Sequence, residues 1–494
     1  KEKFGIVFEF VPYTGDIREK QNLMLAAGDY DEIQDMQRED MVLNYIQAGA
    51  LIELDQYLDK MPDFEKRFDE IIPYWRIPGN GKLYKWETWI PRKLDSDIEV
   101  NDVMVRTDAL EKQGWPNLLS TDSWIAFLRQ AVKDFPTTND MPTIGMTAPF
   151  AESWGLAGIA PILYEKSDKY LPLSNEGFTF NVQTDKFEDY FKNPYVKESY
   201  QFFNQLYREG LLDKECFTDT HDKTIEKLQQ GRAIAAWYII WNQTTANAAL
   251  IENGHPEMQY IRLPVQSNTS VANNEKRAIR METTRPFDSH GITKNCKYPE
   301  RVIELLNWAC TDEGQIIIRS GLEGVHWKRE NGKRVPTETF IKAKQDPEFN
   351  NTQGLGLFSF LASFNLLAED GQPHDLSCEM EYIDNLSLTD RQKEAYKALG
   401  WENSVDWYIK NGVFAWTGLA GSIYIDPASE LGKVHQKMTE LRVKYSAKMI
   451  TAESDEEFEQ IYNEAMAEYE KLNPEAVIDE FNRLYEEAKK QLNN

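Results

Sequence analysis

The sequence lacks long hydrophobic runs and paired cysteines. No run of about 18 apolar residues occurs, so no transmembrane helix is predicted. The four cysteines are far apart and form no C-x-x-C pair, which predicts neither a zinc site nor any one disulfide pairing. Cys310 lies on the apolar side of a predicted helix and is expected to be a small core residue.

Positive charge is also scarce, because 55 Lys and Arg face 81 Asp and Glu for a net charge of −26. A nucleic-acid partner is therefore not expected, since phosphate binding needs clustered basic residues. The same charge weakly disfavours polyanionic ligands such as uronate oligomers. Walker, Rossmann, nucleophile-elbow and H-E-x-x-H motifs are absent, which disfavours an enzyme. Carboxylates are numerous enough that a glycosidase pair stays open.

Strands and helices are predicted to alternate through the first hundred residues. Phe4–Val11 is predicted as a strand, residues 17–27 as a helix and Glu32–Met36 as a second strand. This alternation predicts α/β layers around a mainly parallel sheet. The C-terminal region is predicted to be helical, with Ser454 capping one helix and Pro474 opening another.

The most informative stretch runs from Val196 to Trp241 and combines two helices with a buried strand. Its apolar run, Ala233–Ile240, is too short to span a membrane and suits a strand buried on both faces. Trp237, Tyr238 and Trp241 lie at its far end. Because ligands bind beyond the carboxyl ends of strands in open α/β sheets, these side chains are predicted to face a cleft.

Phrases typical of one protein family occur in order along almost the whole chain. They include GKLYKWETWIP and EGVHW, and they fall at residues 7–33, 47–59, 81–91, 103–128, 196–241 and 298–327. In these stretches the chain resembles the extracellular solute-binding proteins of ABC importers. The likeness is strongest to the large sugar-binding lipoproteins of Gram-positive bacteria and to alginate-oligosaccharide binders.

The resemblance implies a type II, two-lobed periplasmic-binding-protein-like fold of α/β class. Each lobe would hold a mainly parallel sheet flanked by helices, and the C-terminal region would be helical. Residues 1–102 and 263–326 would form the first lobe, and residues 103–262 and 327–494 the second. Two or three strands crossing between the lobes would form a hinge that permits closure on a ligand.

The implied function is capture of an oligosaccharide between the lobes and its delivery to the permease subunits of an ABC transporter. We expect a monomer that is not an enzyme, needs no cofactor and binds no nucleic acid. We also expect an extracellular, lipid-anchored protein whose signal and anchor are absent from this chain. A same-fold binder of a peptide or other non-sugar solute stays open as an alternative, and so does a carbohydrate-active enzyme.

Sugar rings offer flat C–H faces to aromatic side chains and hydroxyls to polar ones. The candidate stacking residues are Trp86, Trp89, Trp154, Trp237, Tyr238, Trp241 and Trp416, and the polar candidates are Asp35, Gln37 and Arg285. The family resemblance suggests Trp86, Trp89 and Trp416. Core packing is an open alternative for each aromatic residue, and a structural ion pair is one for Arg285.

Calcium is a disfavoured alternative. The alginate-type relatives carry a calcium loop just after the helix that here ends near Asp134. Asp134, Asn139 and Asp140 could supply oxygen ligands, but Pro136 interrupts the alternate spacing that calcium ligands need. We therefore predict no metal site.

Overall fold

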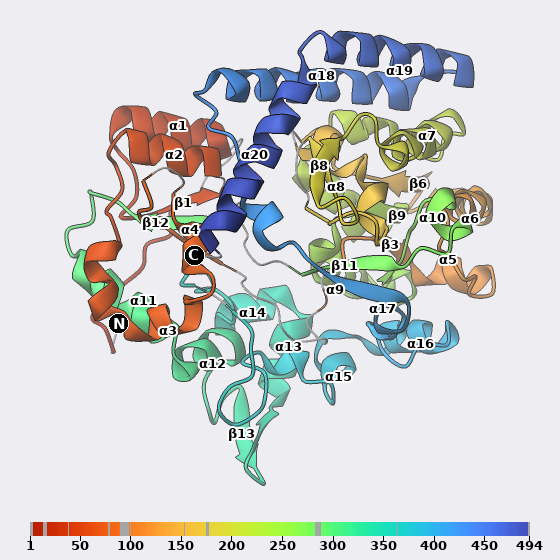
Figure 1. Cartoon of the computed structure of the whole chain (residues 1–494). Coiled ribbons are helices and arrows are strands. Elements are labelled where there is room, and N and C mark those ends of the chain that lie inside the picture. Colours follow the sequence, from red (N-terminus) through yellow and green to blue (C-terminus); the bar gives the residue numbers. More distant parts are fainter. Residues whose placement is uncertain are drawn as a thin grey trace.

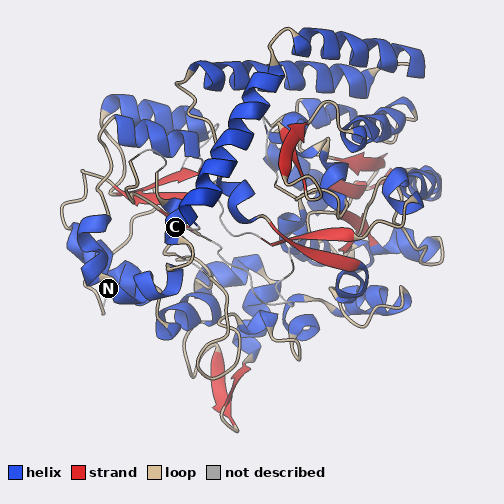
Figure 2. Ribbon diagram, in the orientation of Figure 1, coloured by secondary structure: helices blue, strands red, loops and turns tan. Residues whose placement is uncertain are grey.

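The computed structural model describes residues 3–12, 17–37, 39–77, 80–88, 98, 100–152, 154–173, 177–281, 288–362 and 364–492. Two groups of elements lie side by side, with the helices of residues 430–470 above them and the last helix running down between them in this view (Figure 1). Helices make up most of each group, and short strands form small sheets (Figure 2). Across the described part, none of the helices combines the length and apolar character that a membrane crossing needs.

The first group comes from the N-terminal part of the chain and from a later return. Its elements are α1 (Ile17–Ala27), β1 (Ile33–Gln37), α2 (Glu39–Gln47), α3 (Pro62–Phe68), α4 (Ile72–Trp75), β2 (Trp86–Glu87), β12 (Ser289–Ile292), α11 (Pro299–Ala309) and α12 (Asp312–Ser320). The strands are ordered β1–β12–β2, and both pairings are antiparallel. Phe64, Phe68 and Trp75 pack with α11 to form its core.

The second group forms most of the middle of the chain. Its elements are β3 (Val103–Arg106), α5 (Thr107–Lys112), α6 (Thr121–Asp134), β4 (Thr137–Thr138), β5 (Met141–Pro142), β6 (Ile144–Thr147), β7 (Phe178–Asn181), β8 (Lys186–Asp189), α7 (Pro194–Arg208), α8 (His221–Gln229), β9 (Ala233–Trp237), α9 (Gln243–Glu252), β10 (Tyr260–Leu263) and α10 (Asn268–Ala272). Its main sheet has the order β10–β3–β9–β6.

The remaining elements join the groups and cover them. They are β11 (Arg277–Met281), β13 (Trp327–Glu330), β14 (Lys333–Pro336), α13 (Glu338–Gln345), α14 (Pro347–Gln353), α15 (Ile383–Ser387), α16 (Asp390–Ala398), α17 (Asp406–Asn411), β15 (Gly412–Trp416), α18 (Glu430–Thr451), α19 (Asp455–Glu470) and α20 (Pro474–Leu492). β11 and β15 pair in parallel. The C-terminal helices pack on α7, where the Asn204 amide donates to the carbonyls of Ile450 and Ala452.

The two-lobed α/β fold is confirmed, but the prediction of mainly parallel sheets is wrong. In the four-stranded sheet of the second lobe, β6 and β9 are parallel, while β3 runs antiparallel to both β9 and β10. The first lobe shows the same feature at β12. The reason is topological. In the chain, β3 follows elements of the first lobe, and β12 follows elements of the second lobe. Neither strand therefore enters its sheet through a βαβ connection within its own lobe. A strand that arrives without such a connection is free to pair antiparallel.

Local signals predicted most helices correctly. The helix at 17–27, the strand near residue 33 and the helix opened by Pro474 are confirmed, and Ser454 accepts a hydrogen bond from the Glu457 N–H. The strand predicted at Phe4–Val11 is wrong. Its aromatic side chains instead pack on Phe358 and Phe360, as in the 5.5 Å contact between the Phe8 and Phe358 rings.

The four segment boundaries of the lobes stay a prediction. Phe358 and Phe360 contact the N-terminal segment, and Phe364 packs against Phe68 and Arg67 of α3. These contacts place part of the chain after residue 327 against the first lobe. Cys216, Cys296 and Cys310 form no disulfide, and Cys310 is buried in the first-lobe core.

Candidate ligand-binding site

Four ring side chains gather beyond the end of β9, and we call Trp154, His221, Tyr238 and Trp241 the aromatic platform. Trp241 stacks on His221 with ring centres 6.2 Å apart and planes 29° apart. Trp154 lies 6.1 Å from Trp241, and Tyr238 meets it edge-on at 5.7 Å. Trp241 is nevertheless 49% exposed, so part of its indole is open to a ligand.

The platform follows from the way β9 ends. All five residues of β9 are buried, and the strand stops at Trp237 rather than at Ile240. The next residue, Tyr238, has a φ of +73°, which turns the chain out of the sheet. A short turn at Ile240–Asn242 then leads into α9, and Trp241 projects from it.

Trp154 and His221 are positioned by their own local structure. Trp154 precedes a single π-helical turn, Gly155–Ile159, and a Cβ at Gly155 would collide with the carbonyl oxygen of Pro149. His221 is the first residue of α8, and its backbone N–H donates to a Glu152 carboxylate oxygen at 3.0 Å. Burial lowers the pKa of His221 and so favours its neutral imidazole.

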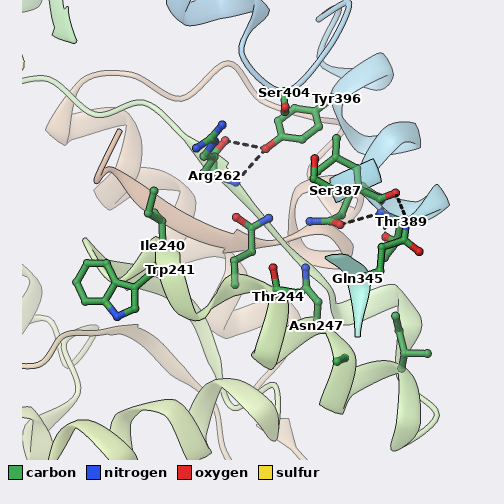
Figure 3. A pocket seen from close by; sticks show the side chains of 15 residues that line it. Ile240, Trp241, Thr244, Asn247, Arg262, Gln345, Ser387, Thr389, Tyr396 and Ser404 are labelled. Carbon is green, nitrogen blue, oxygen red and sulfur yellow. Dashed lines mark hydrogen bonds between the residues drawn. The ribbon is translucent and has the colours of Figure 1, made fainter. Parts of the chain in front are cut away.

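A polar cavity of about 220 Å³ adjoins the platform, and Trp241 forms part of its wall. It lies between α9 and the segment of α15 and α16, with Trp241 and Ile240 on one side and Ser387 and Thr389 on the other (Figure 3). Its polar lining includes Gln243, Thr244, Asn247, Arg262, Gln345, Ser387, Thr389, Gln392, Tyr396 and Ser404.

Hydrogen bonds inside the lining fix several of these side chains. The amides of Gln243, Asn247 and Gln392 all donate to the Tyr260 carbonyl, each at 3.0 Å. Among the described residues that line the cavity, Arg262 is the only charged one. Its guanidinium donates to the Ile98 carbonyl over a long 3.4 Å, and a guanidinium carries five N–H donors in all.

The structure separates the predicted aromatic residues into two kinds. Trp237 is buried, and its Nε1 donates to the Ile159 carbonyl at 2.7 Å. Trp86 is also buried and donates to the Phe360 carbonyl at 2.7 Å. Both side chains are therefore core residues here. Trp154, Tyr238 and Trp241 come together in the platform.

The other predicted residues lie elsewhere. Trp416 is 42% exposed at the end of β15. Asp35 lines a separate groove of about 960 Å³ in the first lobe, beside His290. Gln37 ends β1, opposite Ser289. Trp89 and Arg285 lie outside the described residues.

Sequence patterns missed His221 and the polar residues of α9 and α16. A single histidine at a helix start carries no motif, and Asn247 or Gln392 resembles a solvated helix position. One usable signal was present, because the polar face of Gln243, Thr244 and Asn247 directly follows the exposed Trp241. Spacing of three and four residues places these side chains on one face.

The segment considered for calcium forms a tight hairpin between β4 and β5. Asn139 and Asp140 have φ values of +52° and +60°, as a two-residue hairpin turn requires. The Asn139 amide donates to the Gln230 carbonyl, and Asp134 accepts from Gln130. Within the described ranges, no group of three or more His, Cys, Asp or Glu side chains is arranged to hold a metal ion.

The fold and this site together define a two-lobed solute-binding protein. A family model of the bacterial extracellular solute-binding proteins matches residues 1–320, and the chain belongs to this family.

Solved structures share the fold at low sequence identity. The alginate-binding protein AlgQ2 without calcium ion is 16% identical, with a TM-score of 0.64 over 95% of this chain and 89% of that chain. The Streptococcus pneumoniae ABC-transporter substrate-binding protein FusA in complex with kestose is 16% identical, with a TM-score of 0.64 over 100% of this chain and 94% of that chain.

A curated relative, an uncharacterized protein in the butB 5′ region of Niallia circulans, is 29% identical over 153 residues. That match covers 31% of this chain and 56% of the relative. The chain spans about half the length of the curated relatives that it matches.

Proposed function

We propose that the chain captures an oligosaccharide between its lobes and delivers it to the permease of an ABC importer. The observation that carries the proposal is the half-exposed Trp241 beside a cavity lined by hydroxyl and amide side chains. An aromatic face next to many uncharged donors and acceptors complements a sugar ring, which has an apolar face and a rim of hydroxyls.

The magnitudes are adequate for capture. Covering on the order of 100 Å² of apolar surface on Trp241 contributes ~2.5 kcal/mol at ~25 cal/mol per Å². Four or five hydrogen bonds at ~1 kcal/mol each bring the total to ~6.5–7.5 kcal/mol, which corresponds to a Kd on the order of 10 μM. A ligand that touches both lobes would favour the closed form by its greater affinity for it.

Similar structures support this proposal by their ligands. FusA is solved with kestose, and the N-glycan transport protein NgtS from Streptococcus pneumoniae is solved with Man5GlcNAc at a TM-score of 0.57. AlgQ2 is an alginate-binding protein. We extend the proposal to a monomer that works at the outer face of the membrane, held there by a lipid anchor.

The alternatives fit the site less well. A peptide site needs charged or main-chain contacts for the ligand's termini, and a glycosidase needs two carboxyl groups near the scissile bond. None of the described residues that line the cavity is Asp or Glu. The hydroxyl and amide lining therefore favours binding of a saccharide without its cleavage.

A thermal-shift and calorimetric panel tests the function. It contains kestose, Man5GlcNAc, an alginate trisaccharide and a tripeptide, each with calcium and with a chelator. A saccharide that binds only the folded chain raises the free energy of unfolding by ~2.7 kcal/mol at 100-fold excess over its Kd. Recovery of the intact sugar would exclude hydrolysis. Stabilisation by the tripeptide alone would overturn the proposed ligand class.

A further inference from the structure

Tyr238, at the base of the aromatic platform, has a backbone conformation that few residues with side chains adopt. Its φ of +73° lies in the left-handed region, which costs on the order of 1–3 kcal/mol. Such a conformation persists only where neighbouring groups hold it. Because Trp241 follows three residues later and packs edge-on against the Tyr238 ring, this turn determines where the exposed indole points.

Two groups from distant parts of the chain hold the turn. The Tyr238 N–H donates to the Asp102 carbonyl at 2.9 Å, and the Lys166 ammonium lies 5.9 Å from the centre of the Tyr238 ring. Lys166 also donates to the Asn101 carbonyl at 2.7 Å and lies 3.2 Å from an Asp102 carboxylate oxygen. One ammonium group thus contacts both the entry to β3 and the tyrosine ring.

The Asp102 carboxylate is the centre of a buried charge cluster. It accepts hydrogen bonds from Arg277 Nη2 at 2.7 Å and from the Tyr408 hydroxyl at 3.0 Å, besides its ion pair with Lys166. Asp102, Lys166 and Arg277 are exposed by only 1%, 2% and 3%. Removing such ions from water costs several kcal/mol each. A buried ion cluster therefore seldom stabilises the fold more than apolar residues of the same volume do. Stability alone is therefore a weak explanation for this cluster.

The cluster joins segments that are far apart in the sequence. Asp102 directly precedes β3, Arg277 opens β11, and Tyr408 lies on α17, which leads into β15. All of them meet at one carboxylate beneath the turn that carries the platform.

We propose that Asp102, Lys166 and Arg277 are positioning residues for ligand binding, because their cluster holds the Tyr238 turn and so keeps Trp241 presented for stacking. None of the three needs to touch the ligand. The consequence for affinity rests on the proposed function, whereas the positioning itself is measurable without any ligand.

The test is ¹⁹F NMR of the full chain labelled with 5-fluorotryptophan. The resonance of Trp241 is assigned with Trp241→Phe, and that of the buried Trp124 serves as an internal reference. Lys166→Met and Asp102→Asn should shift or broaden the Trp241 signal and leave that of Trp124 in place. Lys166→Met is the more secure variant, since Asp102 keeps its bonds to Arg277 and Tyr408.

The matched control is Lys85→Met, which removes a lysine of the first lobe that is as buried as Lys166. Lys85 pairs with Glu87 at 2.8 Å, beside β2 and not on any element that carries the platform. This control should lose stability but keep the Trp241 resonance. A Trp241 signal that is unchanged in folded Lys166→Met, or that moves equally in the control, would overturn the proposal.

The native chain supplies a second measurement that does not depend on how a variant folds. Burial and the nearby Arg277 lower the pKa of Lys166 to about 8, and Asp102, Glu165, Tyr238 and Tyr408 are the other titratable groups around it. Raising the pH from 7 to 9.5 should therefore move the Trp241 resonance with a midpoint near 8. A flat profile would contradict the coupling.

The two proposals fail separately. If Trp241 responds to the cluster but no saccharide of the panel binds, the proposed function fails and the positioning stands. If a saccharide binds through Trp241 and both cluster variants leave its resonance and affinity unchanged, the positioning fails and the function stands. If both proposals are correct, Lys166→Met should weaken saccharide binding at least 10-fold in the native chain. The same substitution should weaken binding much less in the Trp241→Ala chain.

Discussion

Replacing Trp241 with alanine should abolish most saccharide binding while leaving the fold intact. The indole is 49% exposed, so truncation removes little core packing and should change the free energy of unfolding by less than about 1 kcal/mol. Losing the stack over on the order of 100 Å² costs ~2.5 kcal/mol of binding, or about 70-fold in Kd. A micromolar complex would thus weaken to roughly 0.1 mM.

Isothermal titration calorimetry of the native chain and Trp241→Ala measures this difference directly. Tyr298→Ala is a suitable control, because Tyr298 is 70% exposed at the start of α11 in the first lobe. The control should bind as the native chain does. Equal affinities of native and Trp241→Ala chains for the same saccharide would refute the stacking argument and move attention to Trp416 or to the first-lobe groove.

Three further predictions concern the surroundings of the platform. The pKa of Lys166 falls from 10.5 to about 8 on folding, so the unfolded chain binds more protons between these values. Because of Lys166, the free energy of unfolding should therefore rise by ~2 kcal/mol between pH 7 and 9.5. Urea titrations should show this rise in the native chain and not in Lys166→Met. Gly155→Ala should cost ~1–3 kcal/mol by collision with Pro149, whereas Gly158→Ala, in the same turn with open space, should not. Arg262→Met should weaken saccharide binding about 10- to 150-fold in calorimetry, since a charged donor contributes ~1.5–3 kcal/mol.

Much of the fold could be predicted because its signals are local. Gly28 ends α1 with a φ of +69°, and Pro474 opens α20, so the sequence near each helix end was sufficient. Strand direction could not be predicted in this way. The antiparallel pairing of β3 with β9 depends on where the chain enters the lobe, which no periodicity records.

The candidate site was predictable only in part, for a similar reason. Trp237 and Trp241 are four residues apart with the same local composition, yet one is buried and the other half-exposed. The difference arises from the turn at Tyr238 and from the Ile159 carbonyl, 78 positions away, which accepts the Trp237 indole N–H. The lining of the cavity combines α9 with α16. The polar face of α9 carries a sequence signal, whereas the α16 residues join it through tertiary contact alone.

Two unfavourable features meet at Tyr238, and this coincidence is itself informative. The left-handed φ at a tyrosine and the desolvation of Asp102, Lys166 and Arg277 both oppose folding. A glycine at position 238 would remove the first, and apolar residues of similar volume would remove much of the second. Both features instead meet at the turn that leads to Trp241. Their shared location beneath the most exposed ring of the platform is what a site held ready for its ligand requires, because a pre-positioned stacking surface avoids the entropy of ordering it during binding.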